Sequence, residues 1–473
     1  MRLRPPSTLL TTASPSRPRL SRCAPRPPFR PLVTLAIETS CDDTAVAVLE
    51  HHHHHHHPAR PTRLLFNERI SADLRAYRGI RPAAALAGHQ RTLAGLVRRA
   101  LAHLGPSGRP DLVAATRGPG IHANLATGLF TAKGLALAWG VPLVGVHHMQ
   151  AHALTPRLVR ALGMPMPMAG GGEAPAPAVT PEFPFLTLLV SGGHSQLVLS
   201  TDVTTHRVLA TTSDAAVGNV LDQTARVILP APVLAASPDV MYGRLLESYA
   251  FDGDGDDDPY AFYTPHRTRA DELADVDTGY TWRLPLPMRA TRRMAYSFAA
   301  VHSTVHAVAA AAGPNMDDAE RRALARHTQR VAFQHLASRL CLALDPGTAA
   351  FEGAAVARAA RTLVVAGGVA CNKFLMHVLR TTLAARGLLR SSAEDAGSGD
   401  GIREIIAPPV ALCTDNAAMI AWAGMEMYEA GWHSDLDVAP VAKWPLDPAV
   451  VLPGKSAGEP GGLMEIGGWL RWK

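Results

Sequence analysis

Two short apolar runs that each end in a glycine pair constrain the fold of this chain more than any other feature. Residues 185–190 lead into Ser191-Gly192-Gly193, and residues 363–366 lead into Gly367-Gly368. A short apolar run bounded by glycine predicts a buried strand. Phosphate-binding α/β proteins place glycines directly after such strands, so that backbone N–H groups can approach an anion. The two pairs therefore indicate a nucleotide held between two lobes.

Strand-like and helix-like patterns alternate along the rest of the chain, which predicts an α/β fold. The predicted strands are 35–37, 45–49, 112–115, 141–146, 185–190, 196–199 and 363–366, and the predicted helices are 83–104, 124–139, one starting near 148, 298–344 and 414–430. Two segments lack this periodicity, a Gly- and Pro-rich loop at 163–184 and a long insertion at about 230–293.

His148 and His152 are four residues apart, and on a helix this spacing places both imidazoles on one face. Two neutral imidazoles so placed can bind one metal ion. A zinc peptidase with the His-Glu-x-x-His motif has its general base next to the first histidine, where this chain has Met149. The pair therefore predicts a metal site that lacks the machinery for hydrolysis. From the pair alone, two structural histidines remain the alternative.

The first 31 residues are rich in Arg, Ser, Thr and Pro and contain no acidic residue. This composition predicts a mitochondrial transit peptide, and a disordered basic tail that binds nucleic acid is the alternative. The leader supplies part of the formal net charge of +6, so that charge is weak evidence for a polyanionic partner. The histidine tract at 51–57 is interpreted as an insertion at a hairpin tip, and no function is assigned to it.

Cysteine content and hydropathy narrow the class of protein further. The five cysteines are scattered, which argues against a disulfide framework and fits a reducing interior. No run of 18 or more apolar residues occurs, so no membrane insertion is expected.

Several segments, in a fixed order, resemble those of the TsaD/OSGEP family. They are 35–44 (LAIETSCDDT), 118–120 with 132–136, 148–152 (HMQAH), 189–194 (LVSGGH), 221–222, 366–372 (AGGVACN) and 413–419 (CTDNAAM). Together they span about residues 32 to 430, which is far more specific than one short motif. The leader, residues 296–300 and the closing 443–447 (KWPLD) are most similar to the mitochondrial branch of the family.

The resemblance implies an α/β, two-lobed, actin-like fold of the kind found in heat-shock chaperones and hexokinase. It divides the chain into a transit peptide (1–31), a first lobe (32–183), a second lobe (184–430) and a C-terminal tail (431–473). It also implies that Asp415 is the third ligand of one divalent metal ion, with iron or zinc as the first choices. Two imidazoles and a carboxylate would leave coordination positions open for substrate.

By the same resemblance, the chain is a tRNA N6-adenosine threonylcarbamoyltransferase. The donor would be threonylcarbamoyl-adenylate, the acceptor would be N6 of the adenosine immediately 3′ of the anticodon in tRNAs that read ANN codons, and AMP would be released. The substrate-binding residues that this implies are Leu189, Val190, Ser191, Gly192, Gly193, Asp222, Gly243, Glu247 and Asn372. The expected partners are tRNA, a YrdC-type synthase that supplies the donor, and a second copy of the chain in a homodimer in the mitochondrial matrix.

Two other classes stay open. One is a metallopeptidase, and the other is an actin-like kinase of a sugar or another metabolite, or a nucleotide-dependent scaffold without its own transferase activity. Ser191 lacks the Gly-x-Ser-x-Gly setting of a nucleophile, so a backbone turn around an anion is favoured and no protein nucleophile is predicted. The chain departs from the family pattern at Gln150, Asn219 and Gln223, and it has Met241-Tyr242-Gly243 in place of Pro-Gly-Gly.

Arginines crowd one N-terminal region, and these could contact the phosphates of an anticodon loop. A solvated arginine face is an equally good interpretation. They are Arg63, Arg69, Arg75, Arg78, Arg81, Arg91, Arg98 and Arg99.

Overall fold

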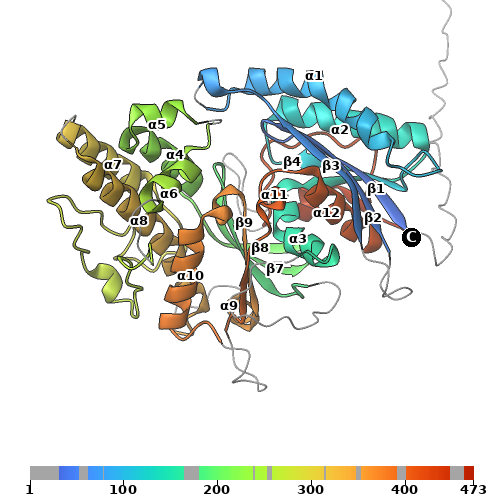
Figure 1. Cartoon of the computed structure of the whole chain (residues 1–473). Helices are drawn as coiled ribbons and strands as arrows, with labels where there is room; N and C mark the ends of the chain where they lie inside the picture. The colour runs from blue at the N-terminus through green and yellow to red at the C-terminus, as the bar shows by residue number, and fades with distance from the viewer. Residues whose placement is uncertain are drawn as a thin grey trace, which may run out of the picture.

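The computed structural model describes residues 31–472 except 53–61, 78, 165–179, 238–239, 253–257, 314–315, 348–352, 391–400 and 448–462. The predicted transit peptide and most of the histidine tract and of the 163–184 loop lie outside the described residues. The strands form two sheets, which lie side by side with helices around them (Figure 1). Among the described helices, none has both the length and the apolar character needed to span a membrane.

The two sheets share one strand order. In the first, β1 (Leu32–Glu38), β2 (Asp43–His51), β3 (Arg63–Ser71), β4 (Leu112–Gly118) and β5 (Leu143–His147) lie in the order β5-β4-β1-β2-β3. In the second, β6 (Phe185–Val190), β7 (Ser195–Asp202), β8 (Thr205–Thr211), β9 (Thr362–Ala366) and β10 (Glu404–Ile406) lie in the order β10-β9-β6-β7-β8. In both sheets the first three strands pair antiparallel and the last two join parallel. This repeat confirms the prediction of a two-lobed α/β fold of the actin-like type.

The helices form three layers around these sheets. α1 (Pro82–Leu101) and α2 (His122–Trp139) pack on one face of the first sheet. α3 (His148–Ala161) and α12 (Ala417–Glu429) lie in the middle of the molecule (Figure 1). The second lobe adds α4 (Val217–Ile228), α5 (Ala231–Ala235), α6 (Tyr242–Phe251), α7 (Ala299–Ala312), α8 (Asp318–Leu344), α9 (Ala354–Ala359) and α10 (Lys373–Ala385). Shorter elements are η1 (Arg75–Tyr77), η2 (Asp271–Leu273), η4 (Gly368–Cys371), α11 (Val410–Cys413), β11 (Trp432–Ser434), α13 (Leu463–Gly467) and β12 (Trp469–Arg471).

Strand β6 is apolar on both faces because helices cover both of its sides. Leu186 and Leu188 belong to the core under the outer helices, whereas Phe185 and Leu189 belong to the core that contains α3 and α12. Successive side chains of a strand point to opposite faces, so this division follows from the period of two. Each such buried side chain contributes about 1.5–3 kcal/mol, which makes the strand a firm support for the turn that follows it.

The end of the chain returns to the first lobe. α12 packs against β1, β2, β4 and β5, and β11 pairs with β5 and with β12. The predicted lobe boundary at residue 430 and the predicted tail at 431–473 therefore do not match this packing. Local hydrophobic periodicity identified the helix at 414–430, but it could not tell which of two apolar sheets the helix would cover.

Two further elements differ from the sequence-based expectation. The predicted helix at 298–344 is two helices, because α7 ends at Gly313, whose φ of +57° lies in the left-handed region. Asp317 then caps α8 by accepting a hydrogen bond from the backbone N–H of Glu320 at 2.7 Å. The insertion at 230–293 contains the regular helix α6, which its short apolar pattern did not reveal. His51, the first residue of the histidine tract, is buried as the last residue of β2.

Buried histidines predict that the protein loses stability as the pH falls below about 6.5. Burial lowers the pKa of His206 and His327 to about 4 and that of His335 to about 3. The unfolded chain binds these protons near pH 6.5, whereas the folded chain resists them, so the free energy of unfolding decreases from pH 6.5 toward pH 4. We expect a loss of about 1–2 kcal/mol per histidine between pH 7 and 5 in urea unfolding. A free energy that stays constant over this range would contradict the assignment.

Candidate functional site

His147 determines how α3, the helix that carries the two predicted histidine ligands, begins. β5 ends at His147, whose Nδ1 accepts hydrogen bonds from the backbone N–H groups of Met149 and Gln150 at 3.1 and 3.4 Å. Its Nε2 donates to the carbonyl of Trp444 at 2.9 Å. Burial holds the pKa of His147 well below its usual value, so the ring is neutral and one nitrogen can accept while the other donates. Because of this cap, α3 begins directly after β5.

The structure brings the three predicted metal ligands together. The rings of His148 and His152 lie 4.7 Å apart, at the start of α3. Asp415 lies between α11 and α12, and its Oδ1 is 3.1 Å from Nε2 of His152 and 3.4 Å from Nε2 of His148. One ligand atom from each residue lies within 4.8 Å of the others. Two imidazoles and one carboxylate are a donor set that suits iron or zinc.

A fourth residue, Glu38, contacts the ring nitrogen of His148 that faces away from Asp415, and the sequence analysis did not identify this residue. Oε2 of Glu38 lies 3.3 Å from Nδ1 of His148, and the Ser40 hydroxyl lies at the same distance from that nitrogen. Oε1 of Glu38 accepts the backbone N–H of Ser40 at 2.5 Å, and Oε2 accepts the hydroxyl of Thr116. A carboxylate on the outer nitrogen orients a ligating imidazole and raises its basicity. The signal available in the sequence was an acidic residue that ends a buried strand.

The carboxylates of Asp415 and Glu38 favour a positive charge on the groups that lie between them. Burial alone would lower the pKa of His148, but Asp415 and Glu38 outweigh it and raise the pKa to about 10. Burial would raise the pKa of Asp415, but His148 and His152 hold it well below its usual range. The pKa of Glu38 is lowered in the same way by His148. A divalent cation held by the three predicted ligands would supply that positive charge, so the residues present fit a metal ion.

The turn after β6 faces this group from the second lobe. The Ser191 hydroxyl accepts hydrogen bonds from the backbone N–H groups of Gly193 at 3.3 Å and His194 at 3.0 Å, which makes it part of the turn. Gly192 and Gly193 are exposed, whereas Leu189 and Val190 are buried in the core and can offer only backbone groups. Burial, together with the nearby charges of His148 and His152, lowers the pKa of His194 to about 4. The turn adjoins the segment of the third predicted ligand through Gly367: a Cβ there would lie 2.5 Å from the carbonyl of Val190, and its own carbonyl accepts a hydrogen bond from Sγ of Cys413 at 3.2 Å, two residues before Asp415.

The remaining predicted substrate residues also meet in one place. Oδ1 of Asp222, on α4, accepts the backbone N–H of Gly243 at 2.6 Å. Oε1 of Glu247, on α6, accepts the backbone N–H of Lys373 at 2.7 Å, next to Asn372. Burial raises the pKa of Glu247 above its usual value, and the hydrogen bonds that its carboxylate accepts from backbone N–H groups offset only part of this rise. Asp222, Gly243, Glu247 and Asn372 thus join α4, α6 and the start of α10.

The side chain of Asn372 is engaged within the protein. Its Oδ1 caps α10 by accepting the backbone N–H of Leu375 at 2.9 Å, and its Nδ2 donates to Gln329 at 2.9 Å. In this conformation the residue fixes the turn between Gly368 and α10. Among the departures from the family pattern, the half-buried side chain of Gln223 donates to that of Asn219 at 3.1 Å on α4.

Gly218 is another residue that the sequence analysis missed. Its backbone N–H donates to the carbonyl of Ser191 at 3.2 Å, and a Cβ there would lie 2.7 Å from that carbonyl and 2.8 Å from the nitrogen of Gly192. Gly218→Ala must therefore displace the glycine turn. We expect binding of an adenylate to weaken on the order of 10- to 100-fold, because displacements near 1 Å have effects of that size.

Gly134→Ala is the matched control for this prediction, since an added Cβ on that exposed α2 residue meets nothing within 4 Å. It should leave adenylate binding unchanged and raise the free energy of unfolding by about 0.4–1 kcal/mol. Calorimetric titration with AMP and urea unfolding measure the two effects. Equal AMP affinities for Gly218→Ala and wild type would show that the turn is not part of the site.

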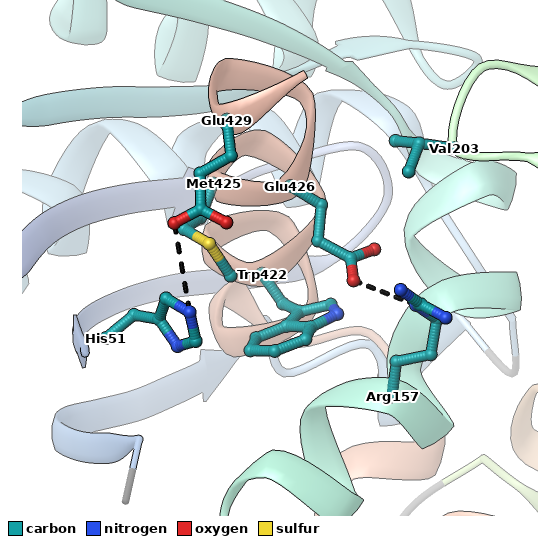
Figure 2. A pocket seen from close by; sticks show the side chains of 7 residues that line it. All are labelled: His51, Arg157, Val203, Trp422, Met425, Glu426 and Glu429. Carbon is teal, nitrogen blue, oxygen red and sulfur yellow. Dashed lines mark hydrogen bonds and ion pairs between the residues drawn. The ribbon is translucent and has the colours of Figure 1, made fainter. Parts of the chain in front are cut away.

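A separate cavity of about 210 Å³ lies where α3, α12 and the β7–β8 turn meet (Figure 2). Its lining residues are His51, Arg157, Val203, Trp422, Met425, Glu426 and Glu429. Figure 2 shows Arg157 and Glu426 pointing toward each other, and their Nε and Oε1 atoms are 2.8 Å apart. None of the predicted site residues lines this cavity. We interpret it as part of the packing between the lobes.

Comparison with known proteins places the chain in a family. The family model TsaD: tRNA N6-adenosine threonylcarbamoyltransferase matches residues 63–422. A Schizosaccharomyces pombe protein named tRNA N6-adenosine threonylcarbamoyltransferase, mitochondrial, is 31% identical over 90% of this chain and 89% of its own length. A Brucella ovis tRNA N6-adenosine threonylcarbamoyltransferase is 34% identical over 87% of this chain and 95% of its own length. The chain belongs to the TsaD family of tRNA N6-adenosine threonylcarbamoyltransferases.

Likeness to solved structures is weaker. The HypF structure from T. kodakarensis covers 85% of this chain and 48% of its own, with a TM-score of 0.42 and 13% sequence identity. The family assignment therefore rests on the sequence matches, and the two-lobed fold rests on the repeated strand order.

Proposed function

We propose that this chain transfers a threonylcarbamoyl group from threonylcarbamoyl-adenylate to N6 of the adenosine immediately 3′ of the anticodon, in tRNAs that read ANN codons. The observation that carries the proposal is one juxtaposition: the glycine turn that follows Val190 adjoins Gly367, and the carbonyl of Gly367 accepts a hydrogen bond from Cys413, two residues before Asp415 in the predicted metal-binding group. An anionic acyl-adenylate placed on that turn would bring its carbonyl near the metal ligands. Family membership supports the same reaction.

The residues divide into those that hold the donor and those that support the metal site. Backbone N–H groups of the turn at 191–193 would hold phosphate, as glycine turns after strands do. Asp222 and Glu247 would hold ribose hydroxyls or the base edge. A bound divalent ion would act as a Lewis acid and template for the acyl carbonyl. His148, His152 and Asp415 would ligate it, with Glu38 fixing the ring of His148.

In this proposal, catalysis depends mainly on how the protein positions the adenosine amine relative to the acyl carbonyl of the donor. The exocyclic amine of adenosine is a poor nucleophile, and AMP is a good leaving group from a mixed anhydride. The protein must therefore hold the amine in line with the carbonyl and exclude competing water. No protein nucleophile takes part, which agrees with the Ser191 hydroxyl being used to build the turn.

The proposal extends to partners and location. The relative from S. pombe is named mitochondrial, and together with the Arg-rich leader this supports action on mitochondrial tRNAs in the matrix. We further propose that a YrdC-type synthase supplies the donor and that the chain acts as a homodimer. The absence of a Glu after His148 continues to argue against the metallopeptidase alternative.

One assay tests the reaction. Purified full-length protein is incubated with unmodified tRNA that reads ANN codons, threonine, bicarbonate, ATP and a YrdC-type synthase. Mass spectrometry of the digested tRNA should then show threonylcarbamoyladenosine beside the anticodon, and omission of this protein should abolish it. Parallel reactions with a sugar, read as ADP, and with a glycoprotein, read as cleavage, test the kinase and peptidase classes. Product in either of those and none in tRNA would refute the proposal.

A further inference from the structure

Six residues from both lobes gather beside the predicted donor site, and we name them the inter-lobe surface. Tyr77, Ile80 and Arg81 come from the segment between β3 and α1, and Arg226, Met241 and Tyr242 come from α4 and the start of α6. Tyr77, Ile80 and Met241 have exposed fractions of 51%, 55% and 48%. Single exposed apolar side chains are normal, but a group of them together with arginines beside a predicted binding site calls for a physical explanation.

The two halves of the surface adjoin. A Cβ built on Gly79, between Tyr77 and Ile80, would lie 4.0 Å from a terminal nitrogen of Arg226. The first half continues from β3, where Arg69 donates to the hydroxyl of Thr414 at 2.6 Å beside the metal ligand Asp415. The second half continues into Gly243, whose backbone N–H donates to Asp222. The surface therefore leads from solvent to both parts of the candidate site.

Each half pairs an arginine with a tyrosine ring. The guanidinium of Arg81 lies 5.1 Å from the ring centroid of Tyr77, and that of Arg226 lies 5.3 Å from the ring centroid of Tyr242. Within the described part of the chain, neither arginine has a carboxylate within ion-pair distance. Their positive charges are thus available to an anion, and the exposed ring of Tyr77 offers a face on which a planar group can stack. Tyr242 is half-buried and packs against the core of the second lobe.

Four of the other arginines predicted as possible phosphate contacts are paired with carboxylates. Arg63 lies 3.6 Å from Glu50, Arg69 lies 3.3 Å from Asp43, Arg75 lies 2.7 Å from Asp73, and Arg99 lies 2.6 Å from Glu68. Arg91 and Arg98 are exposed on α1, and Arg78 lies outside the described residues. Arg81 is the candidate that adjoins the second lobe, which adds Arg226.

We propose that the inter-lobe surface binds the single-stranded anticodon loop of the RNA acceptor. Tyr77 stacks on an unpaired base, and Arg81 and Arg226 contact phosphates. Loop bases can be splayed out and stacked on aromatic side chains, and this combination of rings with arginine is typical of proteins that bind single strands. The inference rests on the proposed function and adds to it the residues that position the acceptor next to the donor.

Fluorescence anisotropy tests this inference. It measures how tightly the full chain binds a labelled RNA stem-loop that carries the anticodon loop of an ANN-reading tRNA. Tyr77→Ala should weaken binding about 5- to 100-fold, as loss of one base stack does, whereas Tyr77→Phe should bind like wild type. Arg81→Ala and Arg226→Ala should each reduce the slope of log affinity against log salt by about one. Arg99→Ala is the control, because Arg99 lies on the last turn of α1 and is paired with Glu68.

Two further measurements separate the possible failures. Calorimetric binding of AMP should be equal in wild type, Tyr77→Ala and Arg81→Ala, which shows that the donor site is intact. If wild type modifies tRNA but Tyr77→Ala, Arg81→Ala and Arg226→Ala bind the stem-loop as Arg99→Ala does, the surface assignment is wrong and the proposed function stands. If wild type binds no stem-loop, the surface assignment is wrong, and the proposed function falls with it only when wild type also fails to modify tRNA. If light scattering shows that these variants change the oligomeric state, the surface is a protein interface and the inference is overturned.

Discussion

Asp415→Asn is expected to lose the metal ion from the candidate site and to form modified adenosine more than about 100-fold more slowly than wild type. Asp415 is the only carboxylate among the three predicted ligands, and its Oδ1 lies within 3.4 Å of both ligand nitrogens. Removing a residue that merely orients a ligand already lowers metal affinity or activity about 10- to 100-fold, so loss of a direct ligand should cost more. Glu38→Gln should fall in that smaller range, because Glu38 acts through His148.

Metal content and rate must both be measured for this prediction. The histidine tract at 51–57 binds metal by itself, so the protein should be purified without nickel resin, and variants should be compared by elemental analysis as equivalents lost relative to wild type. Asp275→Asn serves as the control, since Asp275 is exposed and paired with Arg289 far from the site. Unchanged metal content together with an unchanged rate in Asp415→Asn would rule out this metal centre.

Arg157→Met is expected to lower the free energy of unfolding by about 3–5 kcal/mol, the usual cost of leaving a buried charge unpaired. Nε of Arg157 donates to Glu426 at 2.8 Å, and its guanidinium also donates to the carbonyl of Pro181 at 2.6 Å and lies 4.7 Å from the ring centroid of Phe183. Arg157 thereby ties α3 and α12 to the segment that enters the second lobe. Burial raises the pKa of Glu426 even with Arg157 beside it.

The double variant Arg157→Met with Glu426→Leu should recover most of this loss, because apolar replacement of a whole buried pair is often neutral. The cost of Arg157→Met alone should shrink as the pH falls. A carboxyl whose pKa is raised on folding destabilises the folded state increasingly as the pH rises from its unfolded pKa to the raised pKa, and protonation at lower pH removes the penalty. Urea unfolding at pH 7 and 5 measures both effects, with the exposed Arg75 of the Arg75–Asp73 pair changed to Met as control. A double variant no more stable than Arg157→Met would show that the pair is not the cause.

Much of the candidate site could be predicted because its pieces are local. The spacing of His148 and His152 is a property of one helix, and the turn at 191–193 follows directly from the end of one strand. The repeated alternation of strands and helices was enough to predict an α/β fold, although not the return of α12, β11 and β12 to the first lobe. Asp415 as third ligand came only from resemblance to a family, since nothing in its local sequence indicates a metal.

By itself, the sequence determined the elements, the paired imidazoles and the glycine turns, because each depends on residues a few positions apart and on the fixed periods of helix and strand. Only the tertiary structure decided that Asp415 lies 3.1 Å from His152, which is 263 positions away, that Glu38 supports His148, and that Gly218 packs against the turn of Ser191. These contacts depend on which apolar faces cover each other in space. Hydrophobic burial drives that choice without direction, so no local pattern encodes it.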